Sequence, residues 1–344
     1  MTPSSSISGV GLIGAGRIGT SHAQILAEQV PGAQLTMVAD TRTGAAGSLA
    51  DRFGADAVAD PLQLIKDNSV DAVVIAASAE AHADLIVACA AAGKPIFCEK
   101  PASLTLQDSA RSLAAVEAAG VILQVGFNRR FARDFRATHD AIVRGAIGMP
   151  QLLRSLTRDP GLANPGAVPP WTIFLQTLIH DFDALLWLNP ETDPVEVYAT
   201  ADALVAPDFK ASGLLDTAIV VITFDNGARA VAEASFSAAY GYDVRAEVFG
   251  SAGMVTAGNG ARTAMMLRDA TGLHQETARG DVELMGDAYA AEFVEFVAAI
   301  QQARQPYVTG RDARRALAVA LACIESVRTH APIPIDRSAA TLAR

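Results

Sequence analysis

The stretch VGLIGAGRIG, residues 10–19, decides how this chain begins to fold. Its first four residues are apolar and predict a short buried strand, and the residues after it have helical spacing. Between strand and helix, one glycine permits a tight turn, a second lets a pyrophosphate approach the backbone, and a third lets the helix pack close to the strand. The helix start adds free N–H groups and a partial positive charge. The stretch therefore predicts a dinucleotide site that includes Gly14, Gly16, Arg17, Ile18 and Gly19.

An acidic residue strengthens this prediction. Asp40 ends a second apolar run about 20 residues further on, where a carboxylate accepts hydrogen bonds from the adenosine ribose hydroxyls. Asp40 would also repel a 2′-phosphate, which favours NAD over NADP. Arg42 keeps NADP as an alternative, because a nearby guanidinium can accommodate that phosphate.

The first third of the chain alternates apolar runs with segments of helical spacing, as parallel strands joined by crossover helices do. We expect a Rossmann-type, doubly wound α/β domain over residues 1–127. Its strands are predicted at 10–13, 35–39, 72–76, 95–98 and 121–125. Its helices are predicted at 17–28, 44–53, 82–92 and 106–119.

From residue 128 to 344 strands follow one another through turns, which predicts a second, α+β domain with a large and mainly antiparallel sheet. The clearest hairpin joins residues 217–224 and 228–236 through Asp225-Asn226-Gly227. Further strands are expected at 195–201 and 245–249, and helices at 174–187, 289–300 and 312–328. The last helix is expected to pack back on the first domain.

Composition excludes several classes of protein. The net charge is −10 and no cluster of lysine and arginine occurs, which argues against nucleic acid as a partner. No apolar run reaches the about 18 residues of a membrane-spanning helix. The three cysteines, Cys89, Cys98 and Cys323, lack paired spacing and predict buried free thiols. Residues 1–8 lack the features of a signal peptide and predict a disordered lead-in, so we expect a cytoplasmic protein.

Lys100 is the first catalytic candidate. It follows the fourth predicted strand within Cys98-Glu99-Lys100-Pro101, at the carboxyl edge where open α/β sheets bind ligands. An ammonium group there can hold a substrate hydroxyl, stabilise an alkoxide or take part in proton transfer. From spacing alone, a surface lysine before a loop is an equal alternative.

His180 is the second candidate. Residues 174–187 predict one amphipathic helix whose apolar stripe is Phe174, Leu178, Phe182 and Leu186. Gln176, His180 and Asp183 form a polar stripe, and a histidine facing a cleft can act as a general base. A core histidine is the alternative. No metal is implied, because no second histidine or cysteine stands at ligand spacing.

The sequence resembles the Gfo/Idh/MocA oxidoreductases and, within that family, the bacterial inositol 2-dehydrogenases. The resemblance covers nearly the whole chain. Besides the glycine stretch with His22, which we expect to pack the first helix, it rests on five motifs. They are Glu99-Lys100-Pro101, Gly126-Phe127-Asn128-Arg129-Arg130-Phe131, Arg158-Asp159-Pro160, Ile179-His180-Asp181-Phe182-Asp183 and Tyr240-Gly241-Tyr242-Asp243.

The resemblance implies that Lys100 and His180 face the substrate beside the nicotinamide ring. It also places Ala77, Ser78 and Glu99 at the cofactor. It nominates four further residues for the substrate pocket, and each has a structural alternative. The alternative is a surface salt bridge for Arg129, a turn before Pro160 for Asp159, and strand packing for Tyr240 and Tyr242.

Three departures from the family pattern bear on function. Gln176 stands where inositol dehydrogenases have an aspartate, and an amide orients the imidazole of His180 without adding charge, so that histidine should be a weaker base. Pro169-Pro170-Trp171-Thr172 replaces a Gly-Gly, which places a bulky tryptophan beside the pocket. Ala77-Ser78 replaces a usual Thr-Pro.

The leading hypothesis is an NAD-dependent dehydrogenase that oxidises a secondary ring hydroxyl of an inositol-like polyol or pyranose sugar. One alternative is a dehydrogenase or ketoreductase of an amino or acidic sugar, and another is a catalytically silent regulator that binds cofactor and polyol. Because one face of the second sheet should be too apolar to remain solvated, we also expect a dimer or tetramer.

Overall fold

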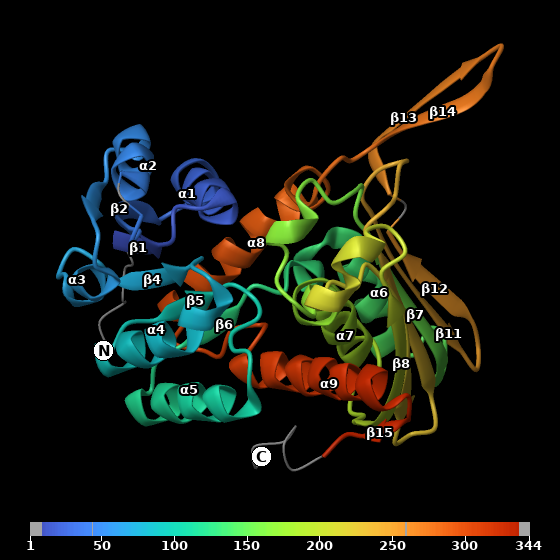
Figure 1. Ribbon diagram of the computed structural model, residues 1–344. Coiled ribbons are helices and arrows are strands. Elements are labelled where there is room, and N and C mark those ends of the chain that lie inside the picture. Colours follow the sequence, from blue (N-terminus) through green and yellow to red (C-terminus); the bar gives the residue numbers. More distant parts are fainter. Residues whose placement is uncertain (1–8, 43, 259, 337–344) are drawn as a thin grey trace. The chain divides into compact units, whose positions relative to one another are not determined.

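The computed structural model describes residues 9–42, 44–258 and 260–336 (Figure 1). The chain divides into two compact units: one runs to Asn128 and also includes Asp287–Arg314, and the other comprises Arg129–Gly286 and the chain from Arg315 onward. Residues 287–314, which we expected in the second domain, thus group with the first unit. The lead-in expected over residues 1–8 lies outside the described residues.

The first unit contains the parallel sheet that the sequence predicts. Its strand order is β3-β2-β1-β4-β5-β6, and every pairing is parallel. Strands β2 and β3 are added on one side of β1, and β4 to β6 on the other. All residues of β1 are buried, as expected for a strand covered on both faces. The strands are β1 (Gly9–Ile13), β2 (Gln34–Ala39), β3 (Asp56–Val58), β4 (Ala72–Ile75), β5 (Ile96–Cys98) and β6 (Leu123–Val125).

The crossover helices of this unit pack on the sheet, α1 on β1 and β2, and α4 on β4 and β5. Our prediction lacked β3 and α3. β3 is an edge strand with two exposed residues, so it has no apolar run, and α3 is a short helix. The helices are α1 (Arg17–Gln29), α2 (Ala45–Phe53), α3 (Pro61–Lys66), α4 (Ala79–Ala91) and α5 (Leu106–Ala119), and most of α8 (Asp281–Gln301) also belongs to this unit.

The second unit is built on a seven-stranded sheet of order β12-β11-β7-β10-β9-β8-β15. The pair β7 and β10 is parallel and the other pairs are antiparallel, so the predicted, mainly antiparallel sheet is confirmed. The strands are β7 (Pro150–Arg158), β8 (Pro194–Asp202), β9 (Thr217–Phe224), β10 (Arg229–Ser235), β11 (Asp243–Gly250), β12 (Met254–Ala257) and β15 (Ile333–Pro334).

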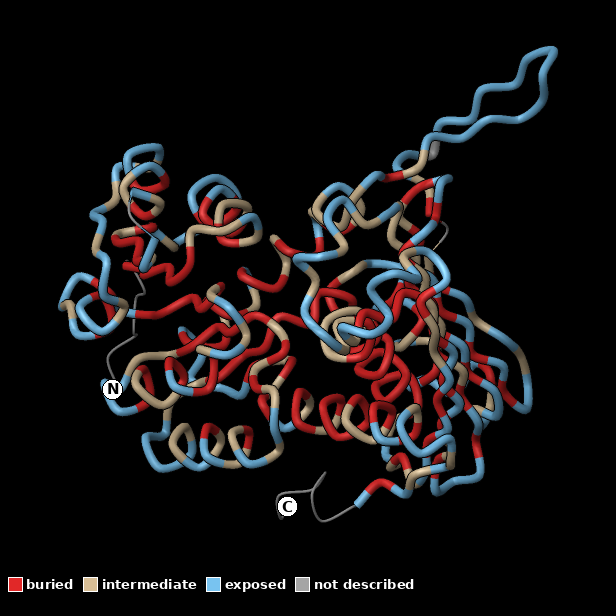
Figure 2. The backbone as a smooth tube through the Cα atoms, in the orientation of Figure 1, coloured by how far each residue is buried: buried red, intermediate tan, exposed pale blue. Residues whose placement is uncertain are grey.

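One face of this sheet is buried and the other is exposed. In β9, Val220 and Ile222 are buried while Ile219 and Val221 are exposed, and Figure 2 shows the same alternation along neighbouring strands. Helix α7 (Leu178–Trp187) packs on β7 and β10. The unit also holds α6 (Arg133–Val143), most of α9 (Gly310–Thr329), and short 3₁₀ turns at Pro165–Ala167 and Pro207–Ser212.

A separate two-stranded hairpin, β13 (Ala261–Asp269) and β14 (Gly272–Thr277), extends from the second unit and is largely exposed (Figures 1 and 2). The prediction of buried free thiols is confirmed, because Cys89, Cys98 and Cys323 are all buried and unbridged. Within the described parts of the chain, none of the helices has the length and apolar character needed to cross a bilayer.

Candidate functional site

The glycine loop after β1 is shaped by a close approach of backbones. Gly14 has a φ of 103°, and a Cβ there would lie 2.4 Å from the carbonyl oxygen of Ala76. A Cβ on Gly19 would lie 1.9 Å from the carbonyl oxygen of Gly14. At Gly16 a Cβ would meet no atom within 4 Å. Two of the glycines are therefore required by the fold itself, whereas Gly16 leaves open space for a ligand.

Asp40 is held in place beside this loop. Its Oδ2 accepts the N–H of Ala15 at 2.7 Å, and its carboxylate also accepts the backbone N–H of Arg42 at 2.8 Å and two guanidinium N–H groups of Arg42 at 3.1 and 2.9 Å. The hydrogen bond from the Arg42 side chain lowers the pKa of Asp40 to about 2. The carboxyl is therefore ionised throughout the physiological range.

These groups border a cavity of about 490 Å³ at the carboxyl ends of β1, β2 and β4. Six residues that the sequence assigned to the cofactor line it, namely Gly14, Gly16, Asp40, Arg42, Ala77 and Ser78. Arg17, Ile18, Gly19, Glu99 and Lys100 are not among its lining residues, although Gly19 shapes it through Gly14. The size of the cavity, the open space at Gly16 and the ionised carboxylate of Asp40 fit the adenosine and pyrophosphate of a dinucleotide.

The sequence analysis missed several residues that line this cavity, among them Thr41, Pro61, Ala81 and Leu85. Pro61 had a recognisable signal. Asp60 accepts the N–H of Leu62, and Pro61 follows it in the first turn of α3, which is a common way to start a helix. Ala81 and Leu85 face the cavity from α4, and their small or apolar side chains carry no signal of ligand binding.

Lys100 is the second residue after β5 and is half-buried. Its backbone N–H donates to Oε2 of Glu99 at 3.1 Å. Glu99 is 6% exposed, and its Oε1 lies 2.6 Å from Nε2 of His22 on α1. Glu99 therefore supports the peptide of Lys100 from the interior of the first unit.

The segment that carries His180 differs from the single α-helix that we predicted. Ile173–Thr177 form a π-helical turn, and α7 begins only at Leu178. Because a π turn contains an extra residue, Gln176 does not stand one regular turn before His180. Trp171, which precedes the turn, has a left-handed φ of 61° and lies beneath the guanidinium of Arg328, 5.0 Å from the ring centroid.

Helix α7 is buried at every position except His180, which is half-buried, as is Gln176. The predicted polar stripe is therefore wrong at Asp183, which is 1% exposed and accepts two hydrogen bonds from Arg130 at 2.9 and 2.5 Å. Since a buried carboxylate needs a charged partner, Asp183 is turned to the core. His180 is left as the polar residue of α7 that reaches the surface of the second unit.

Arg129 is 2% exposed and donates to Oδ1 of Asp181 at 2.6 Å. The hydroxyls of Ser155 and Thr157 also contact both groups, and Ser155 donates to Asp181 at 2.5 Å. The alternative of a surface salt bridge is thus wrong, because the pair is buried. The ion pair between the Arg129 guanidinium and the Asp181 carboxylate fixes the rotation of α7 next to His180.

Asp159 and Tyr242 lie close to this buried pair within the second unit. Burial raises the pKa of Tyr242, and the negative charge of Asp159 raises it further, while Arg129 opposes the shift. The tyrosine is therefore a neutral hydrogen-bonding group at working pH. The charges of Asp159 and Arg129 thus act on the hydroxyl of Tyr242 within the second unit.

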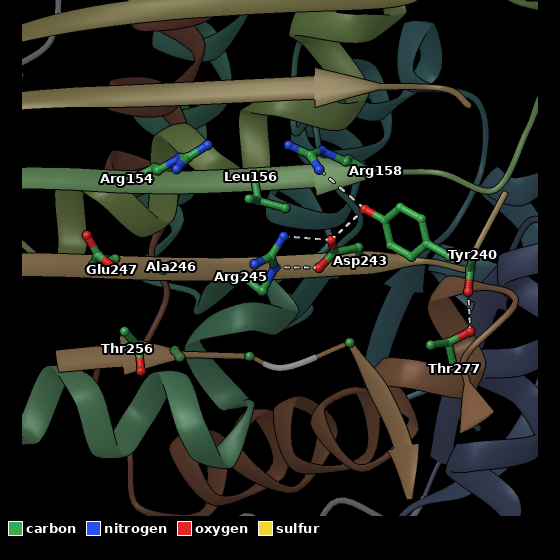
Figure 3. Close-up of a pocket in the computed structure, with 13 residues that line it drawn as sticks. Arg154, Leu156, Arg158, Tyr240, Asp243, Arg245, Ala246, Glu247, Thr256 and Thr277 are labelled. Atoms are coloured by element: carbon green, nitrogen blue, oxygen red, sulfur yellow. Dashed lines mark hydrogen bonds and ion pairs between the residues drawn. The ribbon is translucent and has the colours of Figure 1, made fainter. Parts of the chain in front are cut away.

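Tyr240 lies elsewhere, on the exposed face of the seven-stranded sheet (Figure 3). Its hydroxyl donates to Asp243 at 2.7 Å and accepts from Arg158 at 3.3 Å. It borders a hollow of about 740 Å³ whose charged side chains include Arg154, Arg158, Arg245 and Asp243. Arg245 is paired with Asp243, and Arg154 and Arg158 with Glu233, so these charges are largely neutralised on the sheet itself.

We expect Gly16→Ala and Gly19→Ala to separate cofactor binding from folding. Gly16→Ala should leave the thermal unfolding of the cofactor-free protein unchanged but weaken NAD binding by about tenfold or more, because the methyl group stands where the pyrophosphate approaches. Gly19→Ala should lower both the unfolding temperature and the affinity for NAD, because its Cβ collides with the Gly14 carbonyl. Thermal unfolding and calorimetric NAD titration measure the two effects. Equal losses of thermal stability in both variants would contradict this reading.

Known proteins share this fold and are similar to this chain in sequence. Residues 8–127 match the model of an oxidoreductase family with an NAD-binding Rossmann fold, and residues 140–335 match the C-terminal alpha/beta domain of the same Gfo/Idh/MocA family. A myo-inositol 2-dehydrogenase from Thermotoga maritima is 37% identical over 95% of this chain and 98% of its own length.

A scyllo-inositol 2-dehydrogenase (NAD(+)) from Bacillus subtilis is 34% identical over 94% of this chain and 95% of its own. A solved structure of myo-inositol dehydrogenase from Lactobacillus casei, in complex with NAD(H) and myo-inositol, is 26% identical, with a TM-score of 0.88 over 96% of this chain and 97% of that one. The chain therefore belongs to the Gfo/Idh/MocA family of oxidoreductases.

Proposed function

We propose that this protein is an NAD-dependent dehydrogenase that oxidises a secondary ring hydroxyl of an inositol-like cyclic polyol, or of a pyranose sugar, to a ketone. The observation that carries the proposal is the full-length similarity to inositol 2-dehydrogenases, at 37% and 34% identity for the two relatives above. The ionised Asp40 and the open space at Gly16 supply the features that NAD binding needs.

In the proposed reaction the substrate loses a hydride and a hydroxyl proton. NAD, when bound, would supply the acceptor for that hydride. His180 takes the proton from the hydroxyl group, and the Lys100 ammonium holds the same oxygen and stabilises its developing charge. The two residues come from different units of the chain. His180 suits its role because it is the residue of α7 left outside the core.

The neighbours of His180 set its basicity. Gln176 can accept or donate a hydrogen bond but brings no negative charge, so the imidazolium formed during the reaction is less stabilised than it would be beside a carboxylate. We propose Gln176, Asp159 and Tyr242 as contacts for substrate hydroxyls. Arg129 already binds Asp181, so its part is to hold α7 and its neighbours in place. Tyr240 is retained as a weaker candidate for the pocket, because its hydroxyl already bonds Asp243.

We further propose a cytoplasmic enzyme that assembles as a dimer or tetramer. The three buried cysteines are free, which fits a reducing compartment. The exposed sheet face carries apolar side chains from several strands, including Leu152, Tyr198, Val221 and Phe249, whose exposure ranges from 38% to 58%. A second copy of the same face is a suitable cover for such a patch.

Catalysis is tested with Lys100→Ala and His180→Ala. Each should lower kcat/KM for an inositol by about a hundredfold to ten-thousandfold, because each removes proton transfer or charge stabilisation in the transition state. Reduction of NAD is followed by absorbance with a panel of inositols and aldoses. Lys66→Ala and His274→Ala, at exposed positions, should retain native rates. Turnover that survives in the first two variants would remove these residues from the mechanism, and no turnover by the native protein would remove the proposed activity.

Cofactor preference is tested at Asp40. Asp40→Ala should lower kcat/KM with NAD by about tenfold or more and raise it with NADP, because the ribose hydroxyls lose their acceptor and Arg42 is released to bind a phosphate. The added substitution Arg42→Ala should abolish the gain with NADP. Since the pKa of Asp40 is about 2, the native preference should not change as pH falls to mildly acidic values. An unchanged cofactor ratio in Asp40→Ala would contradict this role.

Assembly is tested by sedimentation velocity at micromolar concentration. The native protein should sediment as a dimer or tetramer, and Val221→Lys should shift it toward monomer, because a charge in the centre of an apolar interface is costly to desolvate. Val143→Lys is the control, since Val143 is 61% exposed at the end of α6. A native monomer would disprove this proposal.

A further inference from the structure

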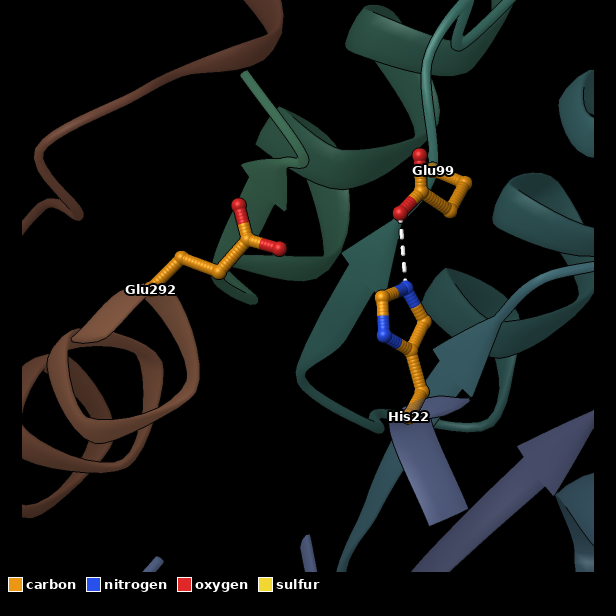
Figure 4. Close-up of side chains that lie close together, drawn as sticks. All are labelled: His22, Glu99 and Glu292. Atoms are coloured by element: carbon orange, nitrogen blue, oxygen red, sulfur yellow. Dashed lines mark hydrogen bonds and ion pairs between the residues drawn. The ribbon is translucent and has the colours of Figure 1, made fainter. Parts of the chain in front are cut away.

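The first unit contains a buried polar cluster to which the proposed chemistry gives no role. His22 on α1, Glu99 at the end of β5 and Glu292 on α8 are 0%, 6% and 0% exposed (Figure 4). One potential ligand atom from each of them lies within 4.8 Å of the other two. Around His22 the rings of Phe97, Tyr289 and Phe293 have centroids at 6.0, 5.6 and 4.8 Å, so the surroundings are apolar.

Within the cluster, only one contact is a hydrogen bond. Nε2 of His22 and Oε1 of Glu99 are 2.6 Å apart, and an ionised carboxylate can only accept, so Nε2 carries the proton. Nδ1 of His22 and both carboxyl oxygens of Glu292 are buried without a hydrogen-bond partner among the described residues. In Figure 4 the carboxyl group of Glu292 points toward His22 and Glu99.

A second buried negative charge at this place would be strongly disfavoured. Glu292 would have to ionise without solvent, without a hydrogen-bond donor and beside the carboxylate of Glu99. Burial, followed by the charge of Glu99, raises the pKa of Glu292 well above its usual range. For Glu99, burial acts in the same direction, but the hydrogen bond from His22 and the nearby Lys100 more than offset it and lower its pKa. Other groups near this cluster are the thiol of Cys98, whose pKa Glu99 helps to raise, and the hydroxyl of Tyr289.

We propose that His22, Glu99 and Glu292 form one proton-holding cluster, in which Glu292 is the neutral acid and the Glu99 carboxylate positions the peptide of Lys100. The acid O–H of Glu292 then complements the lone pair on Nδ1 of His22, either directly after a small side-chain movement or through one water. Nε2–H of His22 donates to Glu99, and Oε2 of Glu99 accepts the N–H of Lys100 at 3.1 Å. A polar chain thus runs from Glu292 on α8 through His22 on α1 to Glu99 and the peptide of Lys100 after β5.

A divalent cation is the competing occupant, because a histidine and two carboxylates are metal-ligand types. The contact between His22 and Glu99 argues against it. At 2.6 Å their N and O atoms are closer together than two ligands of one zinc or manganese ion, so the ion would have to break this hydrogen bond. A proton satisfies the same cluster without any rearrangement of that pair.

The protonated acid has a direct spectroscopic signature. Infrared difference spectra between the native protein and Glu292→Gln at neutral pH should show the carbonyl stretch of a carboxylic acid that only the native protein has. Glu117→Gln, at an exposed position of α5, should show no such band. Lack of the band in the native protein would overturn the proposal. So would stoichiometric zinc or manganese in native protein by elemental analysis, if Glu292→Gln lost it, and the cluster would then be a metal site.

The cluster also predicts how stability depends on pH. The folded state keeps a proton on Glu292 that the unfolded chain releases above about pH 4.5, so stability contributed by this group is complete below that value and is lost as pH rises. The folding equilibrium constant of the native protein, divided by that of Glu292→Gln, should therefore fall by up to about tenfold for each pH unit above about pH 4.5. Urea unfolding across a pH series measures this slope, and parallel curves would overturn the proposal. If Glu292→Gln does not fold, Glu292→Met provides the same comparison.

The positioning of Lys100 rests on the proposed function and has its own readout. Glu99→Gln should lower kcat for the inositol by about tenfold to a hundredfold, with a smaller change in KM, because a misplaced Lys100 weakens the transition state more than the substrate complex. A loss confined to KM would contradict positioning. If the native enzyme oxidises no polyol, the proposed function fails, whereas the infrared band and the pH slope still decide the cluster.

Discussion

The backbone crowding at the end of β1 is the constraint on which the first unit depends. Gly19 brings α1 so close to the strand that a single Cβ would come within 1.9 Å of the Gly14 carbonyl oxygen, and Gly14 is pressed in turn against Ala76 at the end of β4. This contact aims the start of α1 at the space beside Gly16. It also sets the place of His22, which is one turn further along the same helix and reaches Glu99 behind Lys100. The cofactor cavity and the support of Lys100 thus follow from one helix packing against one strand.

In the second unit, buried ion pairs are the constraint that positions the proposed catalytic residue. Asp181 and Asp183 each meet a buried arginine, and leaving either acid without its partner would cost about 3 to 5 kcal/mol. Because both acids follow His180 within one turn of α7, their pairing fixes which way that helix is turned. The histidine is brought to the surface because its neighbours are held in the core. The π turn before α7 adjusts the position of Gln176 at a place where such turns often mark functional sites.

The residues around the proposed site therefore have two different parts. The cavity residues of the first unit, such as Gly16 and Asp40, present backbone and carboxylate to a ligand. Arg129, Arg130 and Glu292 lie behind residues that we assign to the chemistry and are almost fully buried. Such supporting groups restrict the residues in front of them, and a reacting group gains from being held in one orientation.

The sequence by itself determined the features that depend on near neighbours. The glycine stretch, Asp40, the parallel strands and the hairpin at Asp225-Asn226-Gly227 were readable because turn chemistry and hydrophobic period are local properties. Only the tertiary structure decided that Asp183 is buried against Arg130 and that Glu292 joins His22 and Glu99. In each of these cases the deciding partner lies far away in the chain. Burial and charge pairing are set by what packs against a residue, and no local pattern records that.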